Sequence, residues 1–172
     1  MTPRLCTAAL AIVALAACTP EEPTASTSGE VAVSANTYGV RDAQRPPERQ
    51  LEHVRRATTR YHDIRRAIAD GYADINVVIP NMGRHSLRAT LLDAAFDLER
   101  PELLVYTPGE PPHLVAVEYA VPLDLAPTPP EGFSGNADVW DRNTTFGLWT
   151  LHAWIWRHNP DGVFAPMNPL VP

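Results

Sequence analysis

The amino-acid sequence predicts an α+β domain in which one long amino-terminal helix packs on an antiparallel sheet of four to five strands. Two observations lead to this fold class. Apolar residues between Glu48 and Ala69 recur at helical intervals. After Gly71 the apolar residues form short runs separated by turns that contain Pro, Asn and Gly, which is typical of strands. A helix followed by mostly adjacent strands favours an antiparallel sheet with the helix lying across it.

The helix is predicted over residues 48–69. Its apolar positions are three, four or seven residues apart and share one face: Leu51, Val54, Tyr61, Ile64 and Ile68. Pro46 and Pro47 precede its start, and Gly71 follows its end, as helix boundaries often show. We therefore expect one amphipathic helix whose opposite face carries arginine residues.

Five segments after the helix are candidate strands. They are residues 74–79, 85–92, 102–106, 113–121 and 148–156, and the second of them is equally compatible with a short helix. A Pro-rich loop from Pro122 to about Gly135 separates the last two segments. A half-open version of this arrangement leaves a pocket between the helix and the sheet.

The folded unit is expected to span residues 48–172, which is the size of one ordinary domain. The preceding residues, 18–47, are rich in Thr, Ser, Ala, Pro and Glu and lack apolar periodicity. Such a segment cannot bury enough surface to offset the entropy lost on ordering it. We expect residues 18–47 to form a disordered tether.

Residues 1–17 have the composition of a signal peptide. Arg4 precedes a short apolar run, residues 8–15, which is too short to cross ~30 Å of hydrocarbon as a helix. The run continues as Leu15-Ala16-Ala17-Cys18, which resembles the lipobox of bacterial lipoproteins. In that family a signal peptidase cuts before the cysteine, and the thiol carries a diacylglycerol. The resemblance implies a lipid on Cys18, and the alternative is ordinary secretion with a chance cysteine.

A lipid on Cys18 would attach the protein to a bacterial membrane on its extracytoplasmic face, in the cell envelope. Cys6 would leave with the signal peptide, so the mature fold would contain no disulfide. The formal net charge of −6 disfavours nucleic acid as a partner. It also disfavours attachment to anionic headgroups through a basic patch, which leaves the lipid as the expected membrane contact.

A histidine lies between tryptophans near the carboxyl terminus. In an extended strand His152, Trp154 and Trp156 share one face. These rings either fill the core or form the wall of an aromatic ligand pocket, and the sequence leaves both interpretations open. Trp154 and Trp156 are therefore candidate ligand-binding residues, together with His113 at the start of another predicted strand.

Glu118 is a charged residue in an otherwise apolar strand. Its neighbours on the same face are Ala116 and Ala120, whose small side chains leave space around the carboxylate. A buried carboxylate needs a partner, and burial raises its pKa, which suits a general base or a metal ligand. The alternative is that Glu118 lies on the solvent face of an amphipathic strand.

His85 follows a Pro-Asn turn and Gly83, where the chain re-enters the domain after a strand. Together His85, Glu118 and His152 could supply two imidazoles and one carboxylate. This ligand set suits one Zn²⁺ with an open coordination position, or one Fe²⁺ in a facial triad. The three residues lie in separate segments with no short-spaced motif, so their convergence is a hypothesis. The alternative for each histidine is a structural or exposed position.

Several segments together resemble a group of uncharacterised exported bacterial proteins. They are Gly71-Tyr72, Met82-Gly83-x-His85, residues 101–106, residues 117–122, and His152-Ala153-Trp154-Ile155-Trp156-x-x-Asn159-Pro160-x-Gly162. The similarity covers nearly the whole folded unit, and the last segment is its most specific part. The resemblance implies a shared domain, without an established activity. An aromatic residue often follows the histidine of the Met-Gly-x-His turn in the group, whereas this chain has Ser86 there.

Three functions are compatible with these observations. The first is a membrane-anchored protein that binds a small ligand or a metal in a Trp- and His-lined pocket. The second is an enzyme of the cell envelope, in which His152 or a metal activates water and Glu118 is the general base. The third is a structural or interaction module whose tryptophans are all core. The sequence leaves enzymatic activity open.

Overall fold

The computed structural model describes residues 47–172. Within this part of the chain, no helix has the length and apolar character needed to cross a membrane. The predicted signal peptide, the lipid attachment residue Cys18 and the predicted tether lie outside the described residues.

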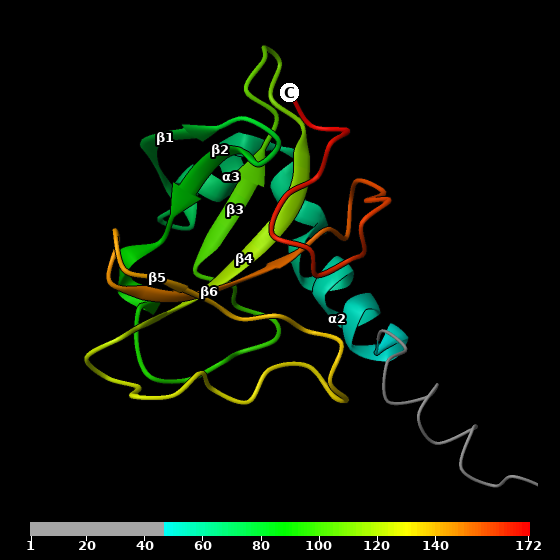
Figure 1. The fold of residues 1–172 in the computed structure, drawn as a ribbon. Helices are drawn as coiled ribbons and strands as arrows, with labels where there is room; N and C mark the ends of the chain where they lie inside the picture. The colour runs from blue at the N-terminus through cyan, green and yellow to red at the C-terminus, as the bar shows by residue number, and fades with distance from the viewer. Residues whose placement is uncertain (1–46) are drawn as a thin grey trace, which may run out of the picture. The chain divides into compact units, whose positions relative to one another are not determined.

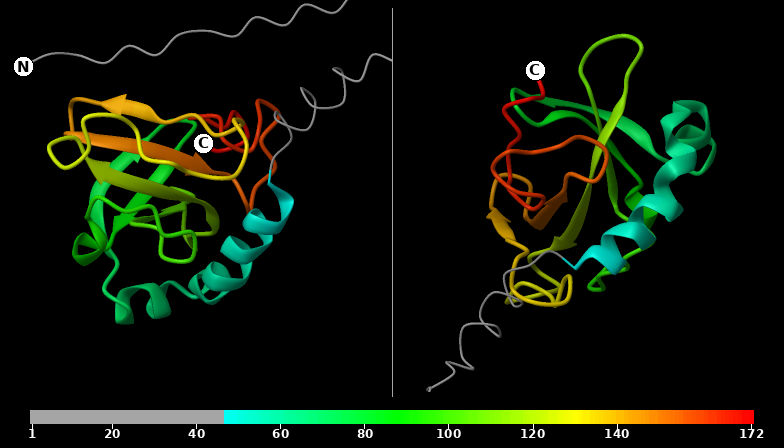
Figure 2. Two further views of the ribbon diagram at one scale, coloured as in Figure 1. Left: turned by 90° about the horizontal axis from the view of Figure 1, so that it is seen from below. Right: turned by 90° about the vertical axis from the view of Figure 1, so that its right-hand side faces the viewer.

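The described residues form a six-stranded antiparallel sheet that curves into a half-barrel (Figures 1 and 2). The strands are β1 (Ala73–Ile79), β2 (Gly83–Leu87), β3 (Leu103–Tyr106), β4 (Leu114–Pro122), β5 (Asp141–Asn143) and β6 (Leu148–Ala153). Their order across the sheet is β1-β2-β3-β4-β6-β5. The first four strands follow one another in space, and β5 lies outside β6 as the second edge.

The prediction of one long helix on four to five strands is wrong. The helical segment is broken into α2 (Glu48–Thr58), the 3₁₀ turn η1 (Thr59–His62) and α3 (Ile64–Ala69). The sheet also has six strands, whereas four to five were predicted. The strand that was not predicted is the short edge strand β5.

The helix breaks at Asp63 for a local reason. Its backbone is extended, with φ −88° and ψ 100°, and its carboxylate accepts a hydrogen bond from the backbone N–H of Arg65. This side-chain cap starts α3 as a new helix instead of continuing α2. The break also resets which side chains face the sheet, so Ala67 is buried whereas Ile68, predicted to be buried, is 62% exposed.

The predicted strands are present with altered ends. The segment predicted over residues 85–92 begins earlier as β2 and then becomes the 3₁₀ turn η2 (Ala89–Leu91). The segment predicted over residues 148–156 ends as β6 at Ala153, so Trp154 and Trp156 lie beyond the strand. β1 contains an irregularity between Asp74 and Val78, where Asn76 has a positive φ of 57°.

Side chains alternate between two faces of the sheet. One face packs against the helical segment and forms the main core, which includes Leu51, Val54, Tyr61, Leu104, Tyr106, Val117, Tyr119 and Leu151. Figure 2 shows the helical segment along one side of the sheet and the last residues of the chain on the other. The second face, which carries Glu118, is partly covered by that terminal segment, because Trp154 and Val171 pack there against Val105, Val115 and Ala116.

Glu102, just before β3, is buried at 2% exposure and was not singled out from the sequence. Its carboxylate accepts a hydrogen bond of 2.9 Å from the backbone N–H of Ala120. Burial raises the pKa of Glu102 to about 7, although the backbone hydrogen bonds oppose this. Ionisation of this carboxyl group is therefore disfavoured in the folded protein.

Glu102 is expected to make the stability of the domain fall between pH 5 and pH 8. A carboxyl group whose pKa is raised on folding stabilises the fold below its unfolded pKa, and this contribution is lost as the pH rises through 7. Relative to the wild type, the Glu102→Gln variant should therefore gain about 2.5 kcal/mol between pH 5 and pH 8. Urea unfolding at both pH values measures this difference. Glu99→Gln, at an exposed position, is the control, and an equal gain in it would refute the assignment to Glu102.

Candidate metal centre

Three strands bring His85, Glu118 and His152 together on the face of the sheet that the helices do not cover. Glu118 on β4 lies directly opposite His152 on β6. On its other side Glu118 lies opposite Leu103 of β3, and β3 in turn pairs with β2, which carries His85. All three polar side chains point to the same face of the sheet. Residues two apart on a strand share a face, and residues paired across neighbouring strands also share a face.

The three side chains are close together and buried. His85 Nε2 lies 3.6 Å from Glu118 Oε2, and His152 Nε2 lies 3.8 Å from Glu118 Oε1. One ligand atom from each residue lies within 4.8 Å of the other two. The exposed fractions of His85, Glu118 and His152 are 3%, 6% and 4%. A tetrahedral zinc site with bonds of ~2.1 Å has ligand atoms about 3.4 Å apart, so small side-chain movements would close this set around an ion.

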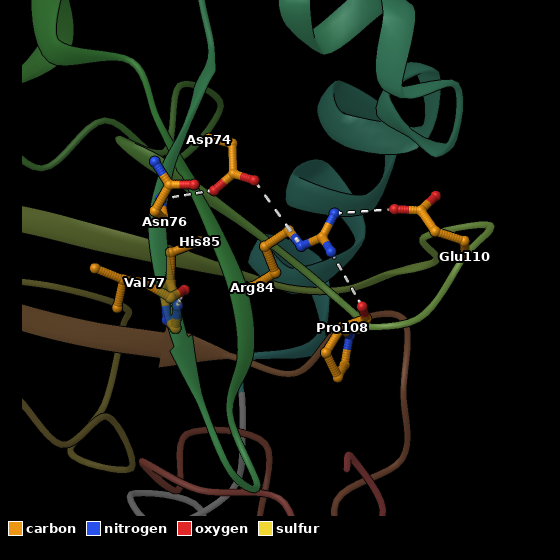
Figure 3. A network of polar contacts seen from close by, with 7 residues as sticks. All are labelled: Asp74, Asn76, Val77, Arg84, His85, Pro108 and Glu110. Carbon is orange, nitrogen blue, oxygen red and sulfur yellow. Dashed lines mark hydrogen bonds and ion pairs between the residues drawn. The ribbon is translucent and has the colours of Figure 1, made fainter.

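The orientation of the His85 ring is set by a hydrogen bond on the side away from Glu118. Its Nδ1 lies 3.2 Å from the backbone oxygen of Val77 on β1. A carbonyl oxygen only accepts, so Nδ1 carries the proton, and in the neutral ring Nε2 presents its lone pair to Glu118. Figure 3 shows His85 beside Val77, while the preceding residue, Arg84, points away to Asp74 and Glu110. A hydrogen bond from the non-ligating nitrogen to a carbonyl is typical of metal-ligating histidines.

Gly83, at the start of β2, adopts the backbone conformation that the turn before His85 requires. Its φ is +112°, a conformation that favours glycine, and a Cβ there would collide with the backbone oxygen of Tyr106 and lie 3.2 Å from Val105 Cγ1. No other residue therefore fits at the start of β2 without moving this strand against β3.

Gly83→Ala is expected to destabilise the domain by about 3 kcal/mol, because it adds backbone strain and a clash with β3. The free energy of unfolding in urea measures the loss. Gly109→Ala is the matched control, since its Cβ would meet nothing within 4 Å. Equal stability of the two variants would contradict this explanation of Gly83.

Burial shifts the proton affinities of two cluster residues in opposite directions. Desolvation raises the pKa of Glu118 to about 7, and the nearby His85 and a hydrogen bond with Thr150 oppose the shift. Desolvation lowers the pKa of His152 to about 4, against the attraction of Asp141. The shared cause is that a buried site disfavours charge. At neutral pH His152 is therefore an uncharged imidazole, the form that binds metals.

One nitrogen of the cluster, His152 Nε2, is buried and has no hydrogen-bond partner within residues 47–172. It lies 3.8 Å from Glu118 Oε1, and the other oxygen of Glu118 lies 3.6 Å from His85 Nε2. A buried polar atom without a partner costs free energy and calls for an explanation. A cation held between the three side chains would satisfy all of them.

A cavity of about 280 Å³ opens above the cluster. Its polar floor includes His85, Glu118, Thr150 and His152. Most of its wall is apolar and comes from β1, β2, β6 and the loop after η2, including Ile75, Val77, Ile79, Leu87, Leu92 and Leu148. This cavity lies on the face of the sheet opposite the helices, so it is not the pocket expected between helix and sheet.

The other residues singled out from the sequence lie elsewhere. Trp154 stacks on His152, with ring centroids 5.9 Å apart, but its Nε1 donates to the backbone oxygen of Ala165 and it does not line the cavity. Trp156 packs against His62 of the helical segment. His113 is exposed at the turn before β4. The structure thus brings together the proposed metal ligands and leaves Trp156 and His113 outside the site.

Thr150 is a polar residue of the cavity that was not identified from the sequence, whereas Asp141 ends the segment 138–141, for which the sequence left a pocket rim and a surface loop both open. Thr150 lies two residues before His152 on β6, and Asp141 lies opposite Thr150 on β5. The two-residue spacing from His152 could have identified Thr150. The sequence could not decide between the two interpretations of Asp141, because its position depends on the pairing of an unpredicted strand.

Comparison of the chain with protein-family models, with curated proteins and with solved structures gave no match. The resemblance to uncharacterised exported proteins therefore stays a prediction, and the geometry of the site is the basis for a functional proposal.

Proposed function

We propose that this protein is a lipid-anchored binding protein of the bacterial cell envelope that holds one Zn²⁺ or Fe²⁺ ion between His85, Glu118 and His152. The ion would lie at the floor of the apolar cavity, with an open coordination position for a small ligand.

The observation that carries the metal proposal is the convergence of the three ligand atoms within 4.8 Å in a buried site. Chance surface clusters of this kind are mostly acidic and solvated, whereas these side chains are buried and come from three different strands. The orphaned Nε2 of His152 and the oriented ring of His85 add independent support.

The ligand types select the metal. Imidazole nitrogen suits Zn²⁺ and Fe²⁺ better than Ca²⁺ or Mg²⁺, which prefer oxygen ligands. Three protein ligands leave at least one position free, which is the arrangement of catalytic and ligand-binding sites and not of closed structural sites. The cavity provides the space for that position.

The metal proposal is tested by elemental mass spectrometry of the full-length protein, purified without a His tag or chelator. We expect about one equivalent of zinc or iron, or one equivalent of zinc after reconstitution, and loss of this metal in His85→Ala and His152→Ala. His113→Ala, at an exposed histidine outside the cluster, is the control and should keep its metal. No uptake by the wild-type protein, or equal uptake by all variants, would overturn the proposal.

The membrane anchor rests on the lipobox sequence around Cys18. Cys18→Ala is expected to move the protein from the membrane fraction to the soluble fraction, since it removes the only lipid attachment site proposed. Fractionation followed by immunoblotting measures the change. Retention of the variant in the membrane fraction would contradict the anchor and leave the metal proposal unaffected.

A further inference from the structure

We infer that the cavity above the metal binds a small amphiphilic monocarboxylate, whose carboxylate occupies the open coordination position and whose apolar chain lies against the cavity wall. This inference rests on the proposed metal site, and it adds the chemical class of the ligand.

The size and the wall of the cavity select a small apolar body. A volume of about 280 Å³ is just below the range of pockets that enclose drug-sized molecules, so the ligand is small. Apolar side chains such as Val77, Leu87 and Leu148 line the space above the polar floor. A ligand with polar groups along its length would leave those groups buried without hydrogen-bond partners.

The charge of the floor selects an anionic head group. A divalent ion held by one carboxylate and two neutral imidazoles leaves one positive charge in a buried site. A single positive charge without a counter-charge is costly there, and a bound carboxylate would neutralise it. An ammonium group would add a second positive charge and has no lone pair until it loses its proton, so the same argument disfavours amines.

Among the described residues that line the cavity, Asp141 is the acidic side chain outside the proposed ligand set, and its charge opposes a ligand carboxylate. It lines the cavity from the edge strand β5, and its charge acts on both Glu118 and His152. Asp141 is exposed, however, so water and salt screen its repulsion of a ligand carboxylate. Its effect is expected to reduce the affinity without reversing the preference for an anion.

Isothermal calorimetry on the zinc-loaded full-length protein tests the ligand class. Hexanoate is expected to bind, and the affinity should rise about fourfold per methylene group from acetate to hexanoate, since each methylene is buried against the wall. Hexylamine and hexanol are the matched controls and should bind at least tenfold more weakly. Hexanol or hexylamine binding as tightly as hexanoate would overturn the inference, as would an affinity that does not depend on chain length.

Two variants separate the wall from the floor. Leu92→Trp fills part of the cavity from a half-buried wall position and should abolish hexanoate binding while zinc stays bound. Asp141→Asn removes the opposing charge and should tighten hexanoate binding about threefold. Unchanged hexanoate affinity in Leu92→Trp would overturn binding in this cavity. Ile75→Trp fills the cavity from β1 and replaces Leu92→Trp if that variant does not fold.

The failure of this inference can be told apart from the failure of the metal proposal. One equivalent of zinc with no hexanoate binding overturns the ligand class and leaves the metal site in place. Hexanoate binding that is equally strong in zinc-free protein overturns the coordination of the carboxylate by the metal. Absence of both zinc and hexanoate binding overturns both proposals.

Discussion

Glu118→Gln is expected to lower the affinity for zinc by about a thousandfold while leaving the fold intact. A zinc ion in a structural site contributes ~12 kcal/mol, and a third of that for one of three protein ligands is about 4 kcal/mol. Glutamine has the same shape as glutamate but is a weak zinc ligand, because its oxygen carries no charge. Competition of the protein with a chromogenic zinc chelator measures the affinity, and Glu52→Gln, exposed on α2, is the matched control.

The metal-free form of Glu118→Gln separates loss of the site from loss of the fold. Burial raises the pKa of Glu118 to about 7, so the stabilising effect of its protonated form is lost as the pH rises through 7. Glutamine cannot ionise, and at pH 8 the metal-free variant should melt at or above the temperature of the metal-free wild type. A clearly lower melting temperature would show that Glu118 holds the fold together, and the affinity loss could then not be assigned to coordination.

Tyr119→Ala, one residue further along β4, is expected to destabilise the fold, whereas Glu118→Gln should lower the zinc affinity and leave the fold intact. Tyr119 is fully buried on the helix-facing side of the sheet. The centroid of its ring lies 4.5 Å from that of Phe96 and 5.7 Å from that of Phe133. Its hydroxyl donates a hydrogen bond of 2.8 Å to the backbone oxygen of Leu98. Removing this aromatic ring should cost about 4 kcal/mol of unfolding free energy.

Urea unfolding of the metal-free protein measures this loss. Tyr119→Phe is the matched control, because it keeps the ring and removes only the hydroxyl, for a loss of about 1 kcal/mol. It also keeps the prediction testable if Tyr119→Ala does not fold at all. A loss below 1 kcal/mol in Tyr119→Ala would show that this face of β4 is not the main core.

The alternation of side chains along β4 was readable from the sequence, and it carried the most useful prediction. Glu118 between Ala116 and Ala120 was assigned to one face, and the structure places these residues together away from the main core. The period of two needs no tertiary information, since it follows from the geometry of any strand. The same period of two on β6 predicted which residues share a face with His152. It could not predict whether this face would be the one that carries Glu118 on β4.

The break of the helix could not be read from apolar spacing. The intervals from Leu51 to Ile68 fit one helix, and the deciding residue is the polar Asp63, whose side chain competes for a backbone N–H. Packing against the sheet decides whether the helix continues or the side chain of Asp63 caps a new one. The apolar spacing does not report this packing, so it predicted one helix where the structure has two. The fold class was predicted wrongly for this reason and because β5 is only three residues long.

Trp156 shows the same limit at the carboxyl end. Its alternation with His152 and Trp154 predicted a shared face, but β6 ends at Ala153. Beyond that residue the backbone N–H of Trp154 donates to the oxygen of Val163, and that of Trp156 donates to the oxygen of Val115. The chain thus leaves its strand path through long-range hydrogen bonds that have no signature in the local sequence.

The irregularity in β1 has a consequence for how copies of this domain behave at high concentration. A half-barrel, unlike a closed barrel, has two edge strands, and an unpaired strand edge is a template for aggregation. At one edge the backbone of Asn76, with its positive φ, interrupts the straight row of donors and acceptors. At the other edge β5 is short and carries two charged residues, Asp141 and Arg142. Both edges are therefore poor templates for the addition of a strand from a neighbouring molecule.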